Sequence, residues 1–229
     1  MLNEIIPYLE MCRREGVSLQ RGMNFELRDN HSVILMSVRP GAPYADRIED
    51  DGATLIYEGH DAPTSHENPN PKTVDQPEKS ENGNFTENGK FHRAAQQFKA
   101  GKGPPERVRV YEKIKQGIWS YNGVFHLVDS WTEPSNSRQV FKFKLIAVEG
   151  EDDFSIPVPK QSQGRRIIPT WVKLEVWKRD GGKCTMCGSS QDLHFDHIIP
   201  YSRGGSSNTP ENIQLLCGKH NIQKHDKIE

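Results

Sequence analysis

The chain has 229 residues, enough for one large domain or for two small ones that each bury a core. Its charges nearly balance, with 30 Lys and Arg against 31 Asp and Glu, which excludes a strongly basic or acidic polyelectrolyte. The balance is uneven: residues 160–229 carry 11 basic and 7 acidic side chains, whereas residues 1–159 carry 19 and 24. The C-terminal third is therefore mildly basic, which permits contact with a phosphate backbone.

Neither the N-terminus nor any internal stretch has the pattern of a targeting or membrane segment. No apolar run approaches the roughly 20 residues that a membrane-spanning helix needs. The first residues include Glu4 and Pro7 and lack a small-residue cleavage site, so we expect no signal peptide. We expect a cytoplasmic protein without a membrane partner.

Alternating and β-branched residues predict a sheet-rich N-terminal part with small helices. In chain order, the expected elements are a short amphipathic helix over 1–15, strands over 31–38 and 53–59, a helix over 91–101, a strand over 107–114, two strands around Asn122-Gly123 within 117–133, and a strand over 138–149.

Two segments separate these elements from one another and from the C-terminal part. Residues 60–90 are rich in proline and almost free of apolar side chains, and so long a loop inside a domain is usually functional or disordered. The stretch 149–166 is acidic and then rich in proline, glutamine and glycine, as a linker is. We therefore predict a domain over 1–150, a linker over 151–164 and a second domain over 165–229.

Three of the four cysteines lie in the last 46 residues, in the pattern of a metal site. Cys184 and Cys187 are separated by two residues, as are Cys217 and His220, and 29 residues lie between the two pairs. This is the ligand spacing of a tetrahedral structural Zn²⁺ site. The alternative, free buried cysteines, is disfavoured because a module of about 60 residues buries too small a core to fold unaided.

Between the ligand pairs, the residues predict a strand over 193–200, a loop, a strand over 213–217 and the start of a helix. The first of these strands ends at adjacent acidic and imidazole side chains, Asp196 and His197, opposite Asn221 at the head of the helix. Asp196 and Asn221 offer the hard oxygen donors that suit Mg²⁺ or Mn²⁺. His197 is then free to act as a general base.

Asp196-His197, followed by Asn212 and by a Cys-x-x-His-Asn-x-x-Lys motif, resembles the HNH, or ββα-metal, nucleases over residues 165–227. The resemblance implies that His197 activates the attacking water and that Asp196 and Asn221 bind a catalytic divalent metal. It also implies that Asn212 orients the loop that carries His197.

Two positions depart from the usual HNH pattern. His220 stands in place of the fourth zinc cysteine, and Asn221 stands where the final histidine is common. We expect Lys224, one turn after Asn221, and Arg203, beside Gly204, to contact phosphate. The alternative for Lys224 is an ordinary solvated helix lysine.

Several N-terminal segments resemble the SRA (YDG) domain of the PUA-like superfamily over residues 22–149. They are PYADRIEDDGATLIYEG, Asp75-Gln76, RVRVY, SYNGVFHLVDSW and FKFKLIAV, with Tyr121-Asn122-Gly123 where Tyr-Asp-Gly is typical. The resemblance implies a β-barrel that flips a modified cytosine out of DNA. Tyr44 and Tyr57 match the positions that stack on the base, and Asp46 is the nearest acid for its amino group. Ordinary β-barrel packing is the alternative for each tyrosine.

Together these features predict an α+β chain: an SRA-like β-barrel domain followed by a zinc-containing ββα-metal domain. The combination resembles McrA-type modification-dependent restriction endonucleases, which implies cleavage of double-stranded DNA that contains 5-methylcytosine or 5-hydroxymethylcytosine. One HNH centre cuts one strand, so we expect a homodimer. Two alternatives stay open: an HNH endonuclease that senses another mark or none, and a non-catalytic zinc-containing DNA-binding protein.

Overall fold

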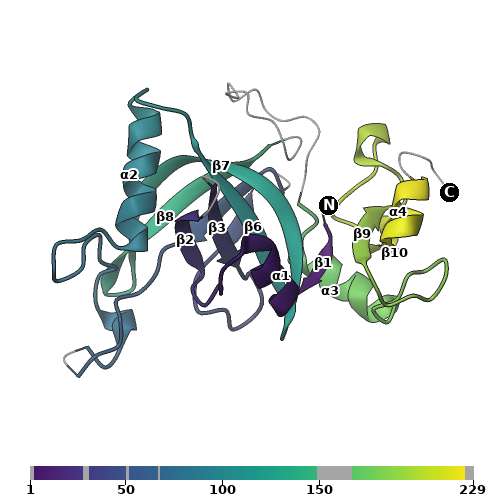
Figure 1. Cartoon of the computed structure of the whole chain (residues 1–229), viewed down its shortest axis with the longest axis horizontal. Coiled ribbons are helices and arrows are strands. Elements are labelled where there is room, and N and C mark those ends of the chain that lie inside the picture. The colour runs from purple at the N-terminus through teal and green to yellow at the C-terminus, as the bar shows by residue number, and fades with distance from the viewer. Residues whose placement is uncertain (1–2, 28–30, 50–51, 67, 149–166, 225–229) are drawn as a thin grey trace.

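The computed structural model describes residues 3–27, 31–49, 52–66, 68–148 and 167–224. Within them the chain forms a strongly curved eight-stranded sheet and, beside it, a two-stranded sheet flanked by helices (Figure 1). The predicted α+β class is confirmed. In this part of the chain, no helix is long and apolar enough to cross a membrane.

The large sheet has the strand order β2-β3-β6-β7-β8-β5-β4, and β1 pairs with β7 outside this path. Its strands are β1 (Ile5–Pro7), β2 (Met23–Leu27), β3 (His31–Met36), β4 (Arg47–Glu49), β5 (Thr54–Glu58), β6 (Glu106–Lys115), β7 (Ile118–Ser135) and β8 (Arg138–Ala147). All pairings are antiparallel except that of β3 with β6. Every residue of β5 is buried, as expected for a strand covered on both faces.

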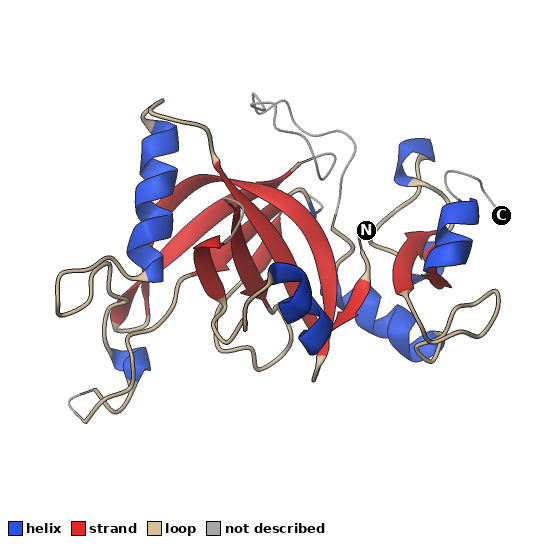
Figure 2. Cartoon of the chain, viewed as in Figure 1, coloured by secondary structure: helices blue, strands red, loops and turns tan. Residues whose placement is uncertain are grey.

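Helix α2 (Glu87–Lys99) packs its apolar side against this sheet (Figure 2). The helix begins four residues earlier than the predicted 91–101, because the Thr86 side chain caps it by accepting from the Gly89 amide at 3.2 Å. Phe91 and Ala95 are fully buried and join the core of the sheet. A methyl group on Gly89 would lie 2.2 Å from the Glu78 carbonyl, so this contact requires glycine.

The prediction of two strands around Asn122-Gly123 is wrong, because β7 runs without a turn through both residues. Gly123 takes a φ of +86°, at the point where the pairing with β6 shifts register between Val110 and Tyr111. An Asn-Gly pair favours a two-residue hairpin turn by itself. Here β6 pairs along β7 on both sides of Gly123, so the pair forms a bulge instead.

The N-terminal helix prediction is correct only in part. Residues 5–7 form β1, and α1 (Tyr8–Glu15) starts after Pro7 and ends at Gly16, whose φ is +66°. Pro7 fits this boundary, since the missing amide proton of a proline interrupts a helix but is tolerated at its start.

The described residues of the segment 60–90 are mostly exposed, and Gln76, Asn88 and Gly89 are the buried ones among them. The segment contains the 3₁₀ helix η3 (Pro71–Thr73) and ends in the first turn of α2. Gln76 is buried; it donates to the Gly59 carbonyl at 2.7 Å and accepts from the Phe141 amide at 2.8 Å. Asp61 pairs with Arg138 at 2.6 Å. These polar contacts tie the segment to β8 at two points, Asp61 and Gln76.

The C-terminal part consists of α3 (Thr170–Arg179), β9 (Leu193–His197), β10 (Ile213–Cys217) and α4 (Gly218–Lys224), with the 3₁₀ helices η4 (Tyr201–Arg203) and η5 (Pro210–Asn212) in the connecting loop. Its core includes Val172 and Val176 of α3 and Phe195 and Leu215 of the two strands.

The chain's first described residues join the two sheets. The Asn3 amide donates to the Tyr121 carbonyl in β7 at 2.8 Å, and the Asn3 carbonyl accepts from the Phe195 amide in β9 at 3.1 Å. Ile5 belongs to β1 but is buried in the C-terminal core. The predicted linker, 151–164, lies outside the described residues, and the domain boundaries stay a prediction.

Candidate functional site

The strands β9 and β10 and the helix α4 form a compact ββα unit. The strands pair so that His197 lies opposite Ile213 and Asp196 opposite Gln214, and α4 follows β10 without a loop. The Gly218 amide donates to the Asp192 carbonyl at 2.7 Å, and a methyl group on Gly218 would lie 2.0 Å from the Asp192 carboxylate. A larger residue at position 218 would therefore have to displace the Asp192 side chain.

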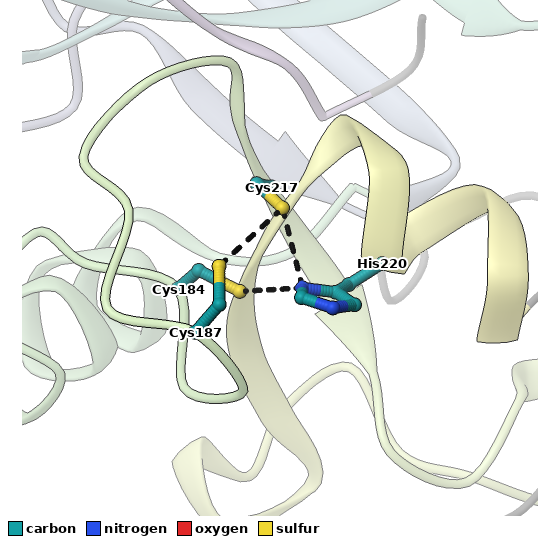
Figure 3. Close-up of side chains that lie close together, drawn as sticks. All are labelled: Cys184, Cys187, Cys217 and His220. Carbon is teal, nitrogen blue, oxygen red and sulfur yellow. Dashed lines mark hydrogen bonds between the residues drawn. The ribbon is translucent and has the colours of Figure 1, made fainter.

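The four predicted zinc ligands come together at this step (Figure 3). Cys184 Sγ lies 3.4 Å from His220 Nδ1, Cys217 Sγ lies 3.3 Å from the same nitrogen, and Cys187 Sγ lies 3.9 Å from Cys217 Sγ. A tetrahedron with metal–sulfur bonds of about 2.3 Å has sulfur–sulfur edges of about 3.8 Å. The cluster has the donors and the dimensions of a tetrahedral metal site.

Backbone hydrogen bonds close the turn that carries the first two ligands. The Cys184 amide donates to the Ser189 carbonyl at 2.7 Å, and Gly188, with a φ of +73°, donates to the Cys184 carbonyl at 2.8 Å. Burial acts to raise the pKa of the Cys184 thiol, but backbone hydrogen bonds, first that of Cys217, lower it to about 6. The thiolate, which is the form that binds metal, therefore predominates at neutral pH.

Asp196 and His197 end β9 and are tied to α4 through Lys224. The Lys224 ammonium lies 2.9 Å from Asp196 Oδ2 and donates to the His197 carbonyl at 2.6 Å. Only 1% of the Lys224 side chain is exposed, so in this structure it neutralises an acid instead of facing solvent. Its predicted phosphate contact stays a prediction, as does that of Arg203, which is exposed at the end of η4.

The His197 ring lies between strand and loop. Its Nε2 is 2.8 Å from the hydroxyl of Ser207, a buried residue. Burial lowers the pKa of His197, Asp196 acts in the opposite direction, and Lys224 lowers it further. The imidazole is therefore neutral at pH 7 and able to accept a proton.

Asn212 holds the loop between Ile199 and Ser206. Its Oδ1 accepts from the Ile199 amide at 2.8 Å, and its Nδ2 donates to the carbonyls of Ile199 at 3.0 Å and Ser206 at 2.9 Å. This is the placement expected of a residue that orients the loop after His197. Asn221 is half-buried on α4, three residues before Lys224, so the two side chains are neighbours on the helix surface.

The three predicted base-pocket residues line one cavity of about 730 Å³ in the N-terminal part. Asp46 accepts from the Ser37 amide at 3.0 Å and from the Glu58 amide at 3.1 Å, one to each carboxylate oxygen. Burial, set against these hydrogen bonds, raises the pKa of Asp46 to about 7. Tyr57 is 1% exposed, and Tyr44 stacks on His60 with ring centroids 5.7 Å apart.

Two residues at these sites are not evident from the sequence. His60 lines the cavity and lies 3.4 Å from the Tyr57 hydroxyl through its Nε2, and Ser207 binds His197. Neither residue belongs to a motif that the sequence shows, so only the folded chain reveals their roles.

Residues 184–227 match the model of the HNH endonuclease family. This C-terminal segment is therefore an HNH endonuclease domain, and the enzyme class predicted from the sequence is confirmed. No curated protein matches the chain.

Solved structures similar to the chain include two SUVH5 SRA complexes. The complex with methylated CHH DNA is 20% identical, with 65% of this chain and 89% of that chain covered and a TM-score of 0.45. The complex with hemi-methylated CG DNA is 24% identical, with the same coverage and a TM-score of 0.44. ScoMcrA, a type IV phosphorothioation-dependent restriction endonuclease, is 15% identical with a TM-score of 0.45; the match covers 99% of this chain and 57% of ScoMcrA.

Proposed function

We propose that this chain, whose residues 184–227 are an HNH endonuclease domain, cleaves double-stranded DNA that contains 5-methylcytosine or 5-hydroxymethylcytosine. The observation that carries the proposal is the pairing of two sites in one chain: Asp196 and His197 at the end of β9, and an aromatic, acid-lined cavity in the N-terminal sheet.

In the proposed hydrolysis, His197 takes a proton from the water that attacks the scissile phosphate. Its burial and the nearby Lys224 ammonium favour the neutral imidazole that this step needs. Asn212, by holding Ile199 and Ser206, keeps the loop from moving relative to His197. In this proposal Arg203, which is exposed on the same loop, contacts the DNA backbone.

Asp196 and Asn221 would hold the catalytic divalent metal, Mg²⁺ or Mn²⁺. Lys224 and Gln214 both contact Oδ2 of Asp196, and among the described residues Oδ1 has no hydrogen-bond partner. One carboxylate oxygen thus remains for a hard cation, together with the amide oxygen of Asn221. When bound, such an ion supplies positive charge to the scissile phosphate and to the leaving oxygen.

The Cys₃His cluster would hold zinc with a structural role. Three sulfur donors and one imidazole suit this borderline-soft ion and leave no open position for water. In this assignment the zinc joins the Cys184–Cys187 turn to the start of α4, and the two metals have separate ligands.

The N-terminal cavity would receive the modified cytosine after it leaves the DNA stack. Tyr44 and Tyr57 supply aromatic faces, and each Asp46 oxygen, already held by one backbone amide, retains a lone pair for the cytosine amino group. Since one centre cuts one strand, we propose that a homodimer makes double-strand breaks. Sedimentation of the chain with and without DNA tests this assembly.

His197→Ala tests the nuclease assignment on methylated plasmid DNA. We expect the cleavage rate to fall about 10²–10⁴-fold, the usual contribution of a general base, with DNA affinity unchanged. His66→Ala, which removes an exposed histidine of the 60–90 segment, is the matched control and should cut normally. Cleavage by His197→Ala at more than about a hundredth of the wild-type rate would show that His197 is not the base.

Competition between methylated and unmethylated duplexes of identical sequence tests the proposed reader, with the full-length His197→Ala chain as the probe. We expect preference for the methylated duplex and a loss of about 1–3 kcal/mol of that binding for Tyr44→Ala, with Tyr44→Phe near wild type. Affinity for unmodified DNA should hardly change, because backbone contacts supply it. Equal affinity of the parent chain for the two duplexes would leave an HNH endonuclease that senses another mark or none.

A further inference from the structure

We infer that Ser207 is a positioning residue for the general base: its hydroxyl accepts the Nε2 proton of His197 and leaves Nδ1 as the nitrogen that takes a proton from water. The inference rests on the proposed role of His197. It goes beyond that role because it names the ring nitrogen that accepts the proton and the residue that positions the ring.

The contact itself is short and enclosed. His197 Nε2 and Ser207 Oγ are 2.8 Å apart, and Ser207 is 3% exposed. A neutral imidazole carries one N–H and one unprotonated nitrogen, and a serine hydroxyl can pair with either, so the assignment depends on which nitrogen water can reach. Water cannot attack from the side that Ser207 covers, and Nε2 therefore cannot be the nitrogen that receives the proton.

The other ring nitrogen is available. Within the described residues, Nδ1 of His197 has no hydrogen-bond partner. It is not one of the buried polar atoms that lack a partner, so it is accessible to solvent. By contrast, Nδ1 of His194, three residues earlier on the same strand, is buried and unpaired. A water molecule can therefore approach Nδ1 of His197 but not Nδ1 of His194.

The loop holds Ser207 in place through its neighbours. Asn212 Nδ2 binds the Ser206 carbonyl at 2.9 Å and the Ile199 carbonyl at 3.0 Å, so one side chain connects the residue before Ser207 to the residue two after His197. The Gly205 amide also donates to the Pro200 carbonyl at 3.1 Å. A methyl group on Gly205 would lie 1.8 Å from the Ile199 carbonyl oxygen, so the loop can close this tightly only with glycine.

This arrangement gives Asn212 and Ser207 distinct tasks. Asn212 fixes the backbone on both sides of the loop. The Ser207 hydroxyl, carried on that backbone, fixes the orientation of the His197 imidazole. The hydroxyl is the only part of Ser207 that the inference requires, so removal of one oxygen atom tests it.

The experiment compares full-length Ser207→Ala and Ser207→Thr with the wild type on methylated DNA. We expect kcat to fall by about 10–100-fold for Ser207→Ala, as for other residues that orient a site histidine, with DNA affinity and thermal unfolding unchanged. Ser207→Thr retains the hydroxyl and should recover at least a third of the wild-type kcat. Ser206→Ala is the matched control, because the Ser206 hydroxyl binds the Asn208 amide and not His197.

A second measurement does not depend on activity. In ¹⁵N-histidine-labelled chain, the signals that disappear in His197→Ala belong to His197, and we expect the tautomer protonated at Nε2. Protonation at Nδ1 in the folded chain would overturn the inference, as would a folded Ser207→Ala chain with kcat within twofold of wild type. If His197→Ala itself cuts normally, the proposed function fails, which is a different result.

Discussion

Two buried acids in the N-terminal part, Glu58 and Asp46, have different partners. Glu58, which is 3% exposed, lies 2.8 Å from the Lys142 ammonium and 3.6 Å from the Arg138 guanidinium. Asp46, which faces the cavity, has two backbone amides but no direct cation. A buried carboxyl without a cation holds its proton more tightly, and this difference has a measurable consequence.

The pH dependence of stability should contain a contribution from Asp46. Its pKa of about 7 in the folded chain lies above the 3.8 of an exposed aspartate, so between these values the folded chain holds a proton that the unfolded chain has lost. Stability from this group is therefore complete below about pH 4 and is lost as the pH rises through 7. Relative to Asp46→Asn, the wild-type free energy of unfolding should fall by about 2–3 kcal/mol between pH 5 and pH 8. Urea unfolding of both chains measures this; parallel pH profiles would contradict it.

At the scale of elements, α4 has seven residues and cannot be stable by its own hydrogen bonds. Its position depends on its two ends. His220 in the first turn belongs to the Cys₃His cluster, and Lys224 in the last turn is tied to Asp196 and to the carbonyl of His197. The helix that carries Asn221 is thus held by the Cys₃His cluster at one end and by the Lys224–Asp196 ion pair at the other.

Loss of the metal should therefore unfold the ββα unit. For Cys217→Ser we expect loss of the bound zinc, rapid amide exchange across β9 and β10, and no DNA cleavage, because structural zinc contributes directly to folding free energy. Cys12→Ser is the matched control, since Cys12 lies outside the cluster and should leave one zinc ion per chain. Purified wild-type chain without zinc would refute the assignment of the cluster.

At the scale of the whole molecule, a buried polar network joins α3 to the N-terminal sheet. The Lys173 ammonium lies 2.6 Å from Glu112 Oε2 in β6 and 2.7 Å from Asn122 Oδ1 in β7. Thr170 also donates to Glu112, and the side chains of Lys173 and Glu112 are both fully buried. Asn122 also contacts Met36, which lines the cavity, so this network lies between the proposed reader and the nuclease.

Lys173→Ala should destabilise the chain by about 3–5 kcal/mol, because it leaves the Glu112 carboxylate buried without its cation. Lys178→Ala removes an exposed lysine from the same helix and should cost less than about 0.5 kcal/mol. Thermal or urea unfolding compares the two, and equal stabilities would show that the network carries no net energy. For the same reason we expect the fragment 1–150, which lacks Lys173, to be less stable than the full chain.

The local pattern of residues was sufficient for several features. The spacing of Cys184, Cys187, Cys217 and His220 predicted a cluster that the folded chain assembles, and the order strand, loop, strand, helix around Asp196 and His197 was correct. These features depend on a few neighbours each: a tight turn provides two ligands, and a strand end places two adjacent side chains.

Tertiary structure alone decided the remaining features. The Asn122-Gly123 pair lies inside β7 because β6 pairs along the strand on both sides of it, and Lys224 is buried because β9 presents an acid and a carbonyl to it. Ser207 contacts His197 across a loop that Asn212 holds, and Lys173 meets Glu112 across 60 intervening residues of sequence. Sequence periodicity does not predict such contacts. Their energy depends on desolvation and on partners distant in the chain, and only the folded chain supplies both.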